Sequence, residues 1–560
     1  MMLARLNRMA PAEFYNRVGH AVLLSTVALI VDPAMASDVS ADIPPSELGE
    51  RLYLEGILPS GKRVQARVQG DVPLADSQVA CVNCHRRSGL SAMEGQTLVP
   101  AVSGAWLYKP REIGRQDFYE TRSSGPGTRP AYTDETLARA IREGVDAAGR
   151  PMNTLMPRYA LSDEEVKPLI AYLKSLSSAP SPGVTDSAIH FATIITEGVE
   201  TRTRDAFLNV LRAYFRDKNA DTRRETRRAI YPAMHKEWKY QSYRRWVLHV
   251  WDLTGPPETW PHQLDDHYRR EPVFAVISGV GNGSWRPVHD FCEGAGVPCV
   301  LPNTDLPALE EDDFYSIYFS RGLALEGELL ARHLGTGPPP GKLIQVFREG
   351  PATVAAEAFR RALDPEDADR LEDRRLETGA ALAAPFWSAL DRSRPSTLIL
   401  WLDDPDLREV QVSAGAGALE RIYISATLCS SPAQAVAPAL RSRLRIIYPF
   451  ALPDSMARNL GRVKPWLRAR QIATTEPRIQ LNAYYAVRLA GDALMHIRGN
   501  FSREYFVEKV EHAVDRLAAP SAYARLSLGP DQRFASKGGW IVAVPERASE
   551  GLEPVAWVVP

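Results

Sequence analysis

The segment Cys81-Val82-Asn83-Cys84-His85 constrains this chain more than any other feature of its sequence. Two cysteines three positions apart, followed at once by a histidine, form the C-x-x-C-H pattern by which haem is attached covalently. The two thiols can form thioethers with the vinyl groups of one porphyrin, and the histidine can offer an imidazole nitrogen to the iron. The pattern therefore predicts one covalent haem, held by Cys81 and Cys84, with His85 as the proximal ligand.

Two other kinds of site use the same residue types, namely a structural zinc site and a redox-active dithiol. Structural zinc needs four Cys or His ligands, and between Ser37 and Ile189 the sequence has none outside the pentapeptide. A thioredoxin-like dithiol lies near a βαβ pattern, whereas the pentapeptide here is followed by Arg86-Arg87-Ser88-Gly89. The flanking sequence therefore favours haem attachment.

The N-terminus has the pattern of a secretory signal. Three arginines within the first 17 residues precede the apolar run 21–31, and Ala34-Met35-Ala36 is an A-x-A cleavage pattern. We expect a signal peptide over residues 1–36 that directs the chain to the periplasm, where disulfides also persist. An uncleaved membrane anchor is the alternative. After cleavage we expect a soluble chain.

Length and composition indicate the domain organisation. A chain of 560 residues predicts two or three domains, and a segment rich in Ser, Pro and Gly (177–183) marks a linker. We predict a monohaem domain over 37–178, a linker over 179–187 and a C-terminal region over 188–560. The formal net charge of −1, with scattered basic residues, gives no sign of nucleic-acid binding.

The second half of the haem domain contains a Met-Pro segment followed by a helix. Met156-Pro157 precedes Ser162 and Glu165, which form a capping-box pattern before an apolar residue series of helical spacing. This stretch resembles the end of a class I cytochrome c, and the resemblance covers about residues 46–177. It implies a small all-α domain with Met156 as the distal iron ligand. The alternative distal ligands are Met93 and Met152.

The same resemblance assigns roles to three further segments. Residues 46–56 look like the N-terminal helix of the family, with Gly49 near its crossing with the last helix. Pro100 and Gly104 look like the family's P-x-x-x-G segment, which implies that the Pro100 carbonyl accepts the Nδ1–H of the proximal histidine. Independently, Thr133–Glu143 reads as a helix that Thr133 caps and Gly144 ends.

The C-terminal region alternates strand-like apolar runs with amphipathic helices, which predicts parallel sheets covered on both faces and arranged as two doubly wound lobes. The expected strands are His190–Thr196, Trp246–Trp251, Val273–Ser278, Lys342–Phe347, Thr397–Leu402, Arg421–Ser425 and Arg445–Tyr448. The expected helices include Thr203–Phe215, Ala324–His333, Ala352–Ala362 and Pro432–Leu440.

The order of these elements resembles type 1 periplasmic binding proteins, the fold of branched-chain amino-acid receptors. The stretches that carry the likeness are Phe274–Gly281, Val297–Thr304 and Tyr315–His333. The resemblance implies a small-molecule ligand between the lobes, at strand ends and helix N-termini. The candidate ligand contacts, each of which could instead be a helix cap or turn residue, are Ser284, Trp285, Asn303, Thr304, Ser430 and Ser431.

Two cysteines of this region lie seven residues apart. Backbone reach allows a disulfide between Cys292 and Cys299, and two buried thiols are the alternative. No nucleophile or acid–base constellation stands out, and Asp403-Asp404 reads as a turn and helix cap, so no catalytic residues are predicted.

Together these observations predict a c-type cytochrome that passes single electrons between periplasmic redox partners and carries a module for a small solute or a partner protein. A His/Met haem has no open coordination position, which favours electron transfer over catalysis at the iron. The alternatives are a ligand-responsive redox sensor, a solute receptor, and the haem-linked subunit of an oxidase or dehydrogenase.

Overall fold

The computed structural model describes most of the chain from Pro44 onward, and residues 45–560 form one compact unit. The residues described are 44–68, 71–94, 97–111, 128–228, 244–308, 310, 313–337, 341–377, 379, 382, 384–411, 419–431, 437–497, 499–529, 532–545 and 551–560. The predicted signal peptide over residues 1–36 lies outside them, as does the side chain of Met93.

Helices form the frame of the N-terminal domain. They are α1 (Pro45–Glu55), α2 (Val82–His85), α3 (Gly104–Leu107), α4 (Asp134–Glu143) and α5 (Asp163–Ser175). The predicted capping box is present at α5, where the Ser162 side chain accepts a bond from the Glu165 amide and the Glu165 side chain bonds back. Thr133 caps α4, and Gly144 ends it in the left-handed conformation.

The expectation of an all-α domain is wrong, because this domain also contains short strands. β1 (Gln65–Val68) pairs antiparallel with β2 (Val72–Ala75) and with β5 (Arg158–Tyr159). A separate hairpin joins β3 (Ala92–Glu94) and β4 (Thr97–Val99). The chain between α1 and α2 is longer than a simple helix connection, and pairing satisfies its backbone amides and carbonyls.

The crossing of α1 and α5 is close enough to require glycine. A Cβ built on Gly49 would lie 2.0 Å from the carbonyl oxygen of Pro168 in α5. The crossing brings the buried side chains of α1, Leu52 and Tyr53, into one core with the apolar face of α5.

We expect Gly49→Val to destabilise the N-terminal domain by at least about 3 kcal/mol, because the two backbones would have to separate. The measurement is the shift of the urea midpoint. Gly461→Ala is the control, because a Cβ at that helical position meets nothing within 4 Å, and alanine favours a helix by roughly 0.5–1 kcal/mol. Equal shifts for the two variants would contradict the close crossing.

The first lobe of the C-terminal region (lobe one) is built on a parallel five-stranded sheet in the order β10-β9-β8-β6-β7. The strands are β6 (Ala188–Ile195), β7 (Arg245–Asp252), β8 (Ala275–Val280), β9 (Cys299–Val300) and β10 (Ser316–Ile317). Successive residues of a strand point to opposite faces. Accordingly, Phe191 and Ile277 pack in one core and Ala192 and Val276 in another, so both faces are covered.

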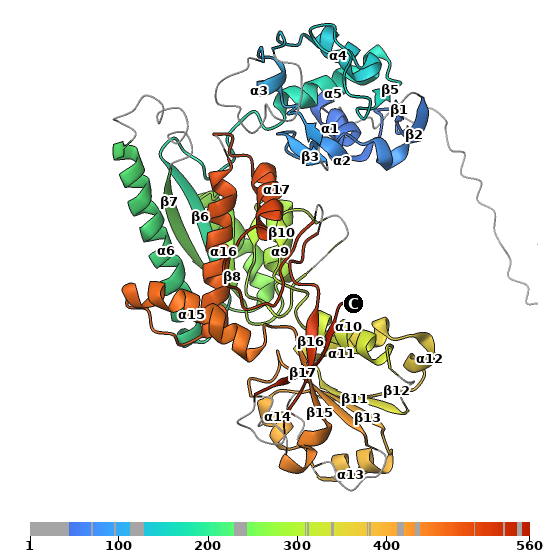
Figure 1. Ribbon diagram of the computed structural model, residues 1–560, viewed down its shortest axis with the longest axis vertical. Coiled ribbons are helices and arrows are strands. Elements are labelled where there is room, and N and C mark those ends of the chain that lie inside the picture. The colour runs from blue at the N-terminus through green and yellow to red at the C-terminus, as the bar shows by residue number, and fades with distance from the viewer. Residues whose placement is uncertain are drawn as a thin grey trace, which may run out of the picture. The chain divides into compact units, whose positions relative to one another are not determined.

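Helices from distant parts of the sequence cover these two faces. The first core receives α6 (Thr201–Arg228), α15 (Pro453–Ala469), α16 (Pro477–Met495) and α17 (Arg503–Val514), and the second receives α8 (Trp260–Arg270) and α9 (Arg286–Gly294). Figure 1 shows α16 and α17 beside β6 and β8 of the same lobe. The chain therefore returns to lobe one after forming the second lobe.

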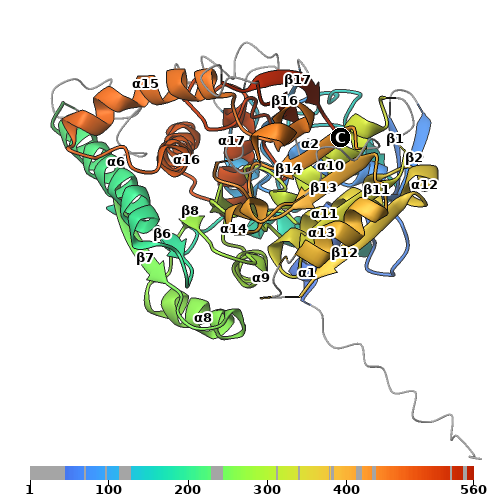
Figure 2. The same ribbon diagram turned by 90° about the horizontal axis from the view of Figure 1, so that it is seen from below.

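The second lobe (lobe two) is built on a seven-stranded sheet in the order β12-β11-β13-β14-β15-β16-β17 (Figure 2). Its parallel part repeats the strand order of lobe one, and the last two strands are antiparallel. The strands are β11 (Leu343–Arg348), β12 (Leu371–Leu376), β13 (Thr397–Trp401), β14 (Arg421–Ser425), β15 (Leu444–Tyr448), β16 (Gly539–Ala543) and β17 (Glu553–Val558).

Lobe two also buries both faces of its sheet, which confirms the expectation of two doubly wound lobes. α10 (Leu323–Leu334) and α11 (Pro351–Ala362) contribute to one core, and α13 (Ala384–Arg392) and α14 (Asp404–Arg408) to the other. The expected helix Pro432–Leu440 is not observed in its described part, where Pro438–Arg443 forms a 3₁₀ helix. Among the helices described, none combines the length and apolar character needed to cross a membrane.

Candidate functional site

The C-x-x-C-H pentapeptide forms one short helix. Cys81 stands at the N-cap of α2, and His85 is its last residue. The His85 amide bonds to the Cys81 carbonyl at 2.9 Å. This turn places Cys81 against the domain core and leaves Cys84 exposed, so the two thiols and the histidine belong to one short helix.

The imidazole of His85 is held at one nitrogen. Nδ1 lies 3.1 Å from the carbonyl oxygen of Pro100, and the side chain is 7% exposed. Burial lowers the pKa of His85 to about 4, with the Pro100 carbonyl opposing the shift. A neutral imidazole with Nδ1–H bonded to a carbonyl has its Nε2 lone pair available for a metal. The free Nε2 of His85 therefore fits a haem iron.

The Met-Pro segment is tied to the attachment turn. Tyr159 lies in β5, and its hydroxyl donates to the Val79 carbonyl at 2.7 Å and lies 4.0 Å from the Cys81 sulfur. The Arg158 side chain donates to the Met156 carbonyl. Met156 and Met152 are both half-buried against the domain core. Tyr159, three residues after Met156, therefore connects this segment to the attachment turn, and Met156 and Met152 stay alternative predictions for the distal ligand.

Helix α17 contacts the residues that follow the pentapeptide. The Glu508 carboxylate accepts bonds from the Ser88 amide at 2.8 Å and from its hydroxyl at 2.6 Å. Glu511 pairs with Arg86 and with Arg533, both at 2.5 Å, and the Arg86–Glu511 pair is largely buried. Sequence reasoning missed the contacts of Ser88 and Arg86 with α17, because the residues that form them are more than 400 positions apart.

The Glu508 carboxylate predicts a pH dependence of stability. Burial raises its pKa to about 7, against the lowering effect of the Ser88 bonds, whereas an unfolded glutamate titrates near ~4.3. Between these values the native state binds more protons than the unfolded state, so stability falls as the pH rises.

We expect Glu508→Gln to match the wild type at about pH 3.5, below the pKa of an unfolded glutamate, and to be more stable by about 1–3 kcal/mol at pH 8, because the amide stays neutral. Thermal midpoints across this range measure the effect. Glu511→Gln is the contrasting variant, and it should lose stability at every pH because Arg86 and Arg533 both lose a carboxylate partner. Parallel profiles for wild type and Glu508→Gln would contradict the prediction.

Lobe one has a pocket of about 280 Å³ at the carboxyl ends of β6, β8 and β9. Strand order reverses between β6 and β8, and ligands of open α/β sheets bind at such a point. The walls also include the first residues of α6 and α16. The lining residues are Gly198, Val199, Glu200, Thr203, Val280, Gly281, Asn282, Asn303, Thr304, Asp305, Arg478, Ile479, Asn482 and Tyr523.

The structure brings two of the six predicted ligand contacts to this pocket, Asn303 and Thr304. Ser284 is exposed and accepts a bond from the Arg286 amide. Trp285 is fully buried, because Gly279 and Gly281 leave room for its indole. The expectation that Trp285 stacks on a ligand is therefore wrong for this structure.

The other two predicted contacts, Ser430 and Ser431, lie against a carboxylate of the chain itself. Asp404 accepts bonds from both backbone amides and from the Ser430 hydroxyl. At the corresponding edge of lobe two, Arg348 forms a two-pronged pair with Asp406 at 2.9 and 2.7 Å. Asp403 caps α14, as the sequence predicted. In lobe two the predicted contacts Ser430 and Ser431 therefore already bond to a carboxylate of the chain itself.

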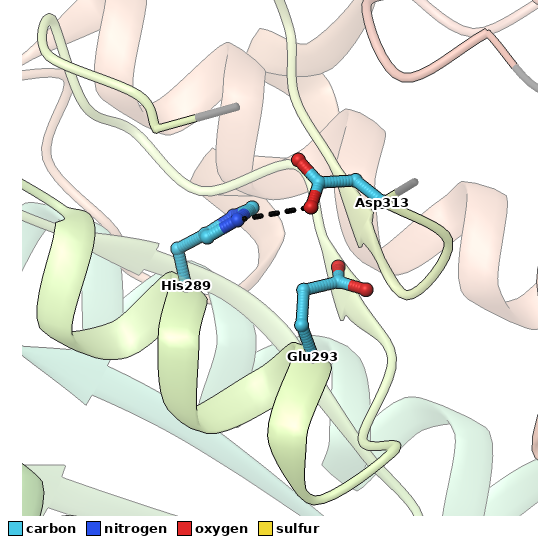
Figure 3. A group of neighbouring side chains, drawn as sticks. All are labelled: His289, Glu293 and Asp313. Atoms are coloured by element: carbon cyan, nitrogen blue, oxygen red, sulfur yellow. Dashed lines mark ion pairs between the residues drawn. The ribbon is translucent and has the colours of Figure 1, made fainter. Parts of the chain in front are cut away.

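Figure 3 shows His289 and Glu293 on α9 facing Asp313 on the loop before β10. Their ligand-type atoms lie within 4.8 Å of one another, so the group could hold a metal ion. Each already has protein partners. His289 pairs with Asp313 at 3.2 Å and with the Tyr318 hydroxyl at 2.9 Å. The Glu293 carboxylate accepts three backbone amides of residues 314–316, which orders this loop.

The predicted disulfide between Cys292 and Cys299 is not formed in the structure. Both are free, fully buried cysteines. Burial raises the pKa of the Cys292 thiol, and a hydrogen bond with Cys299 adds to the shift. The two residues lie at the end of α9 and the start of β9, where small apolar side chains fill the core.

The sequence of residues 75–177 matches the Cytochrome c family. A search of curated protein sequences found no match.

Several solved structures are similar to the C-terminal region. One is a possible leucine/isoleucine/valine-binding protein from Rhodopirellula baltica (16% identity, 68% of this chain and 98% of that one, TM-score 0.45). Another is an ABC transporter substrate-binding protein from Sphaerobacter thermophilus (14%, 67% and 98%, 0.49). A third is a solute-binding protein from R. palustris in complex with benzoate (12%, 67% and 97%, 0.46).

Proposed function

We propose that this chain is a periplasmic c-type cytochrome that transfers single electrons and carries a solute-binding module. The observation that carries the proposal is the C-x-x-C-H helix with a buried His85 whose Nδ1 bonds to the Pro100 carbonyl. The match of residues 75–177 to the Cytochrome c family supports it. A haem bound there supplies reversible one-electron chemistry.

The residues around the helix would hold such a group in fixed roles. Cys81 and Cys84 would form the thioethers and His85 would be the proximal ligand. The Pro100 carbonyl fixes the imidazole tautomer and makes the ring a stronger donor. Met156 is proposed as the distal ligand, and this would close the sixth position to small molecules.

The experiment that tests this function is spectroscopy of the exported, purified protein. A reduced-minus-oxidised difference spectrum with sharp α and β bands, together with haem that stays bound on a denaturing gel, is the expected result. Loss of the haem on denaturation would refute covalent attachment.

A second candidate, a ligand-responsive redox sensor, is favoured by the position of α17. This helix bonds Ser88 and Arg86, and it packs against α16, which lines the lobe-one pocket. If solute binding alters these contacts and thereby shifts the haem potential, the solute affinity must differ between Fe(II) and Fe(III) by the same free energy. A coupling of about 1–3 kcal/mol corresponds to roughly 45–130 mV in midpoint potential. Equal midpoint potentials with and without saturating solute would refute the redox-sensor function and leave only the electron-carrier function.

A further inference from the structure

One residue that lines the lobe-one pocket, Asn482, has a buried side-chain acceptor for which the described residues supply no donor. Asn303 donates from Nδ2 to the Ser278 hydroxyl at 3.2 Å and to the Gly279 carbonyl at 3.1 Å. Its Oδ1 must therefore accept, and it accepts from Nδ2 of Asn482 at 3.0 Å. This chain of bonds fixes the orientation of the Asn482 amide.

The unsatisfied group is the oxygen of the Asn482 side-chain amide. Asn482 lines the pocket and is 2% exposed, and its Oδ1 has no hydrogen-bond partner among the described residues. An unsatisfied buried acceptor costs about 1–3 kcal/mol. A ligand that donates an N–H or O–H to this oxygen would recover that cost.

The charges of the lining favour a cation over an anion. The lining residues include two carboxylates, Glu200 and Asp305, and one positive charge, that of Arg478. Arg478 is already engaged, since it lies 3.6 Å from Asp305 and over the ring of Phe450.

Two helices, α6 and α16, begin at the pocket, and a helix N-terminus attracts anions. The chain supplies its own carboxylates there, because Glu200 directly precedes α6 and Glu476, which pairs with Arg202 of α6 at 2.8 Å, directly precedes α16. Little remains to attract an anionic ligand.

We propose that the lobe-one pocket binds a small protonated amine, whose N–H groups bond to Asn482 Oδ1 and whose charge faces Glu200, the lining carboxylate that is not paired with Arg478. The volume of about 280 Å³ limits its size. This inference rests on the proposed solute-binding function and specifies its ligand class.

The test is calorimetric titration of the full-length protein with three probe sets of matched size. These are amines (methylamine, ethanolamine, butylamine), carboxylates (acetate, butyrate) and polyols (ethylene glycol, glycerol). At least one amine should bind saturably, with no binding of carboxylates or polyols. Asn482→Leu should weaken amine binding at least about tenfold. Asn459→Leu is the matched control, because Asn459 lies on α15 outside the lining and should leave affinity unchanged.

Glu200→Gln serves if Asn482→Leu does not fold, because Glu200 is exposed, and it should also weaken amine binding. Binding of a carboxylate or polyol without an amine would overturn the amine inference but leave solute binding standing. Unchanged amine affinity in both pocket variants would place the site elsewhere and also overturn it. No binding of any probe would refute both the inference and the proposed solute-binding function.

Discussion

Replacing Cys81 and Cys84 together by alanine is expected to abolish covalently bound haem. Each thioether needs one of these two thiols, and the only other cysteines, Cys292, Cys299 and Cys429, are buried in the C-terminal lobes. The measurement is haem staining after denaturing electrophoresis, with the protein band quantified on the same gel.

Each single cysteine variant is expected to keep part of the stain, since one thioether still links the porphyrin to the chain. Cys429→Ala is the control and should stain as the wild type does. A double variant that retains its stain would show that the haem is not attached at the pentapeptide, and the proposed function would lose its main support.

Replacing Met156 by alanine is expected to lower the midpoint potential by on the order of 100 mV, part of the range of about 0.8 V that axial ligation spans. A thioether favours Fe(II), so its loss favours Fe(III). The Met–iron absorption near ~700 nm should disappear at the same time. Spectroelectrochemistry measures both effects on one sample.

Met152→Ala is the matched control, because Met152 is also half-buried against the same core. It should leave the band and the potential largely unchanged. The opposite pattern would move the ligand four residues upstream. If both variants keep the absorption band, the sixth ligand is a different residue.

The local patterns of the sequence predicted many single elements. The Ser162 and Thr133 caps and the run Arg421–Ser425 lie where the sequence placed them. These features depend on residues a few positions apart, so a short window contains all the information. The charged edge strand Leu371–Leu376 was missed, because its alternating burial leaves few apolar residues in the run.

The sequence by itself predicted the chemistry proposed for the pentapeptide, because Cys81, Cys84 and His85 lie within five residues and belong to one short helix. Tertiary structure alone decided the pocket and the contacts of α17. Asn303 meets Asn482 across 179 positions, and Ser88 meets Glu508 across 420. Such pairs form only when the chain returns to lobe one after building lobe two, and no local periodicity encodes that return.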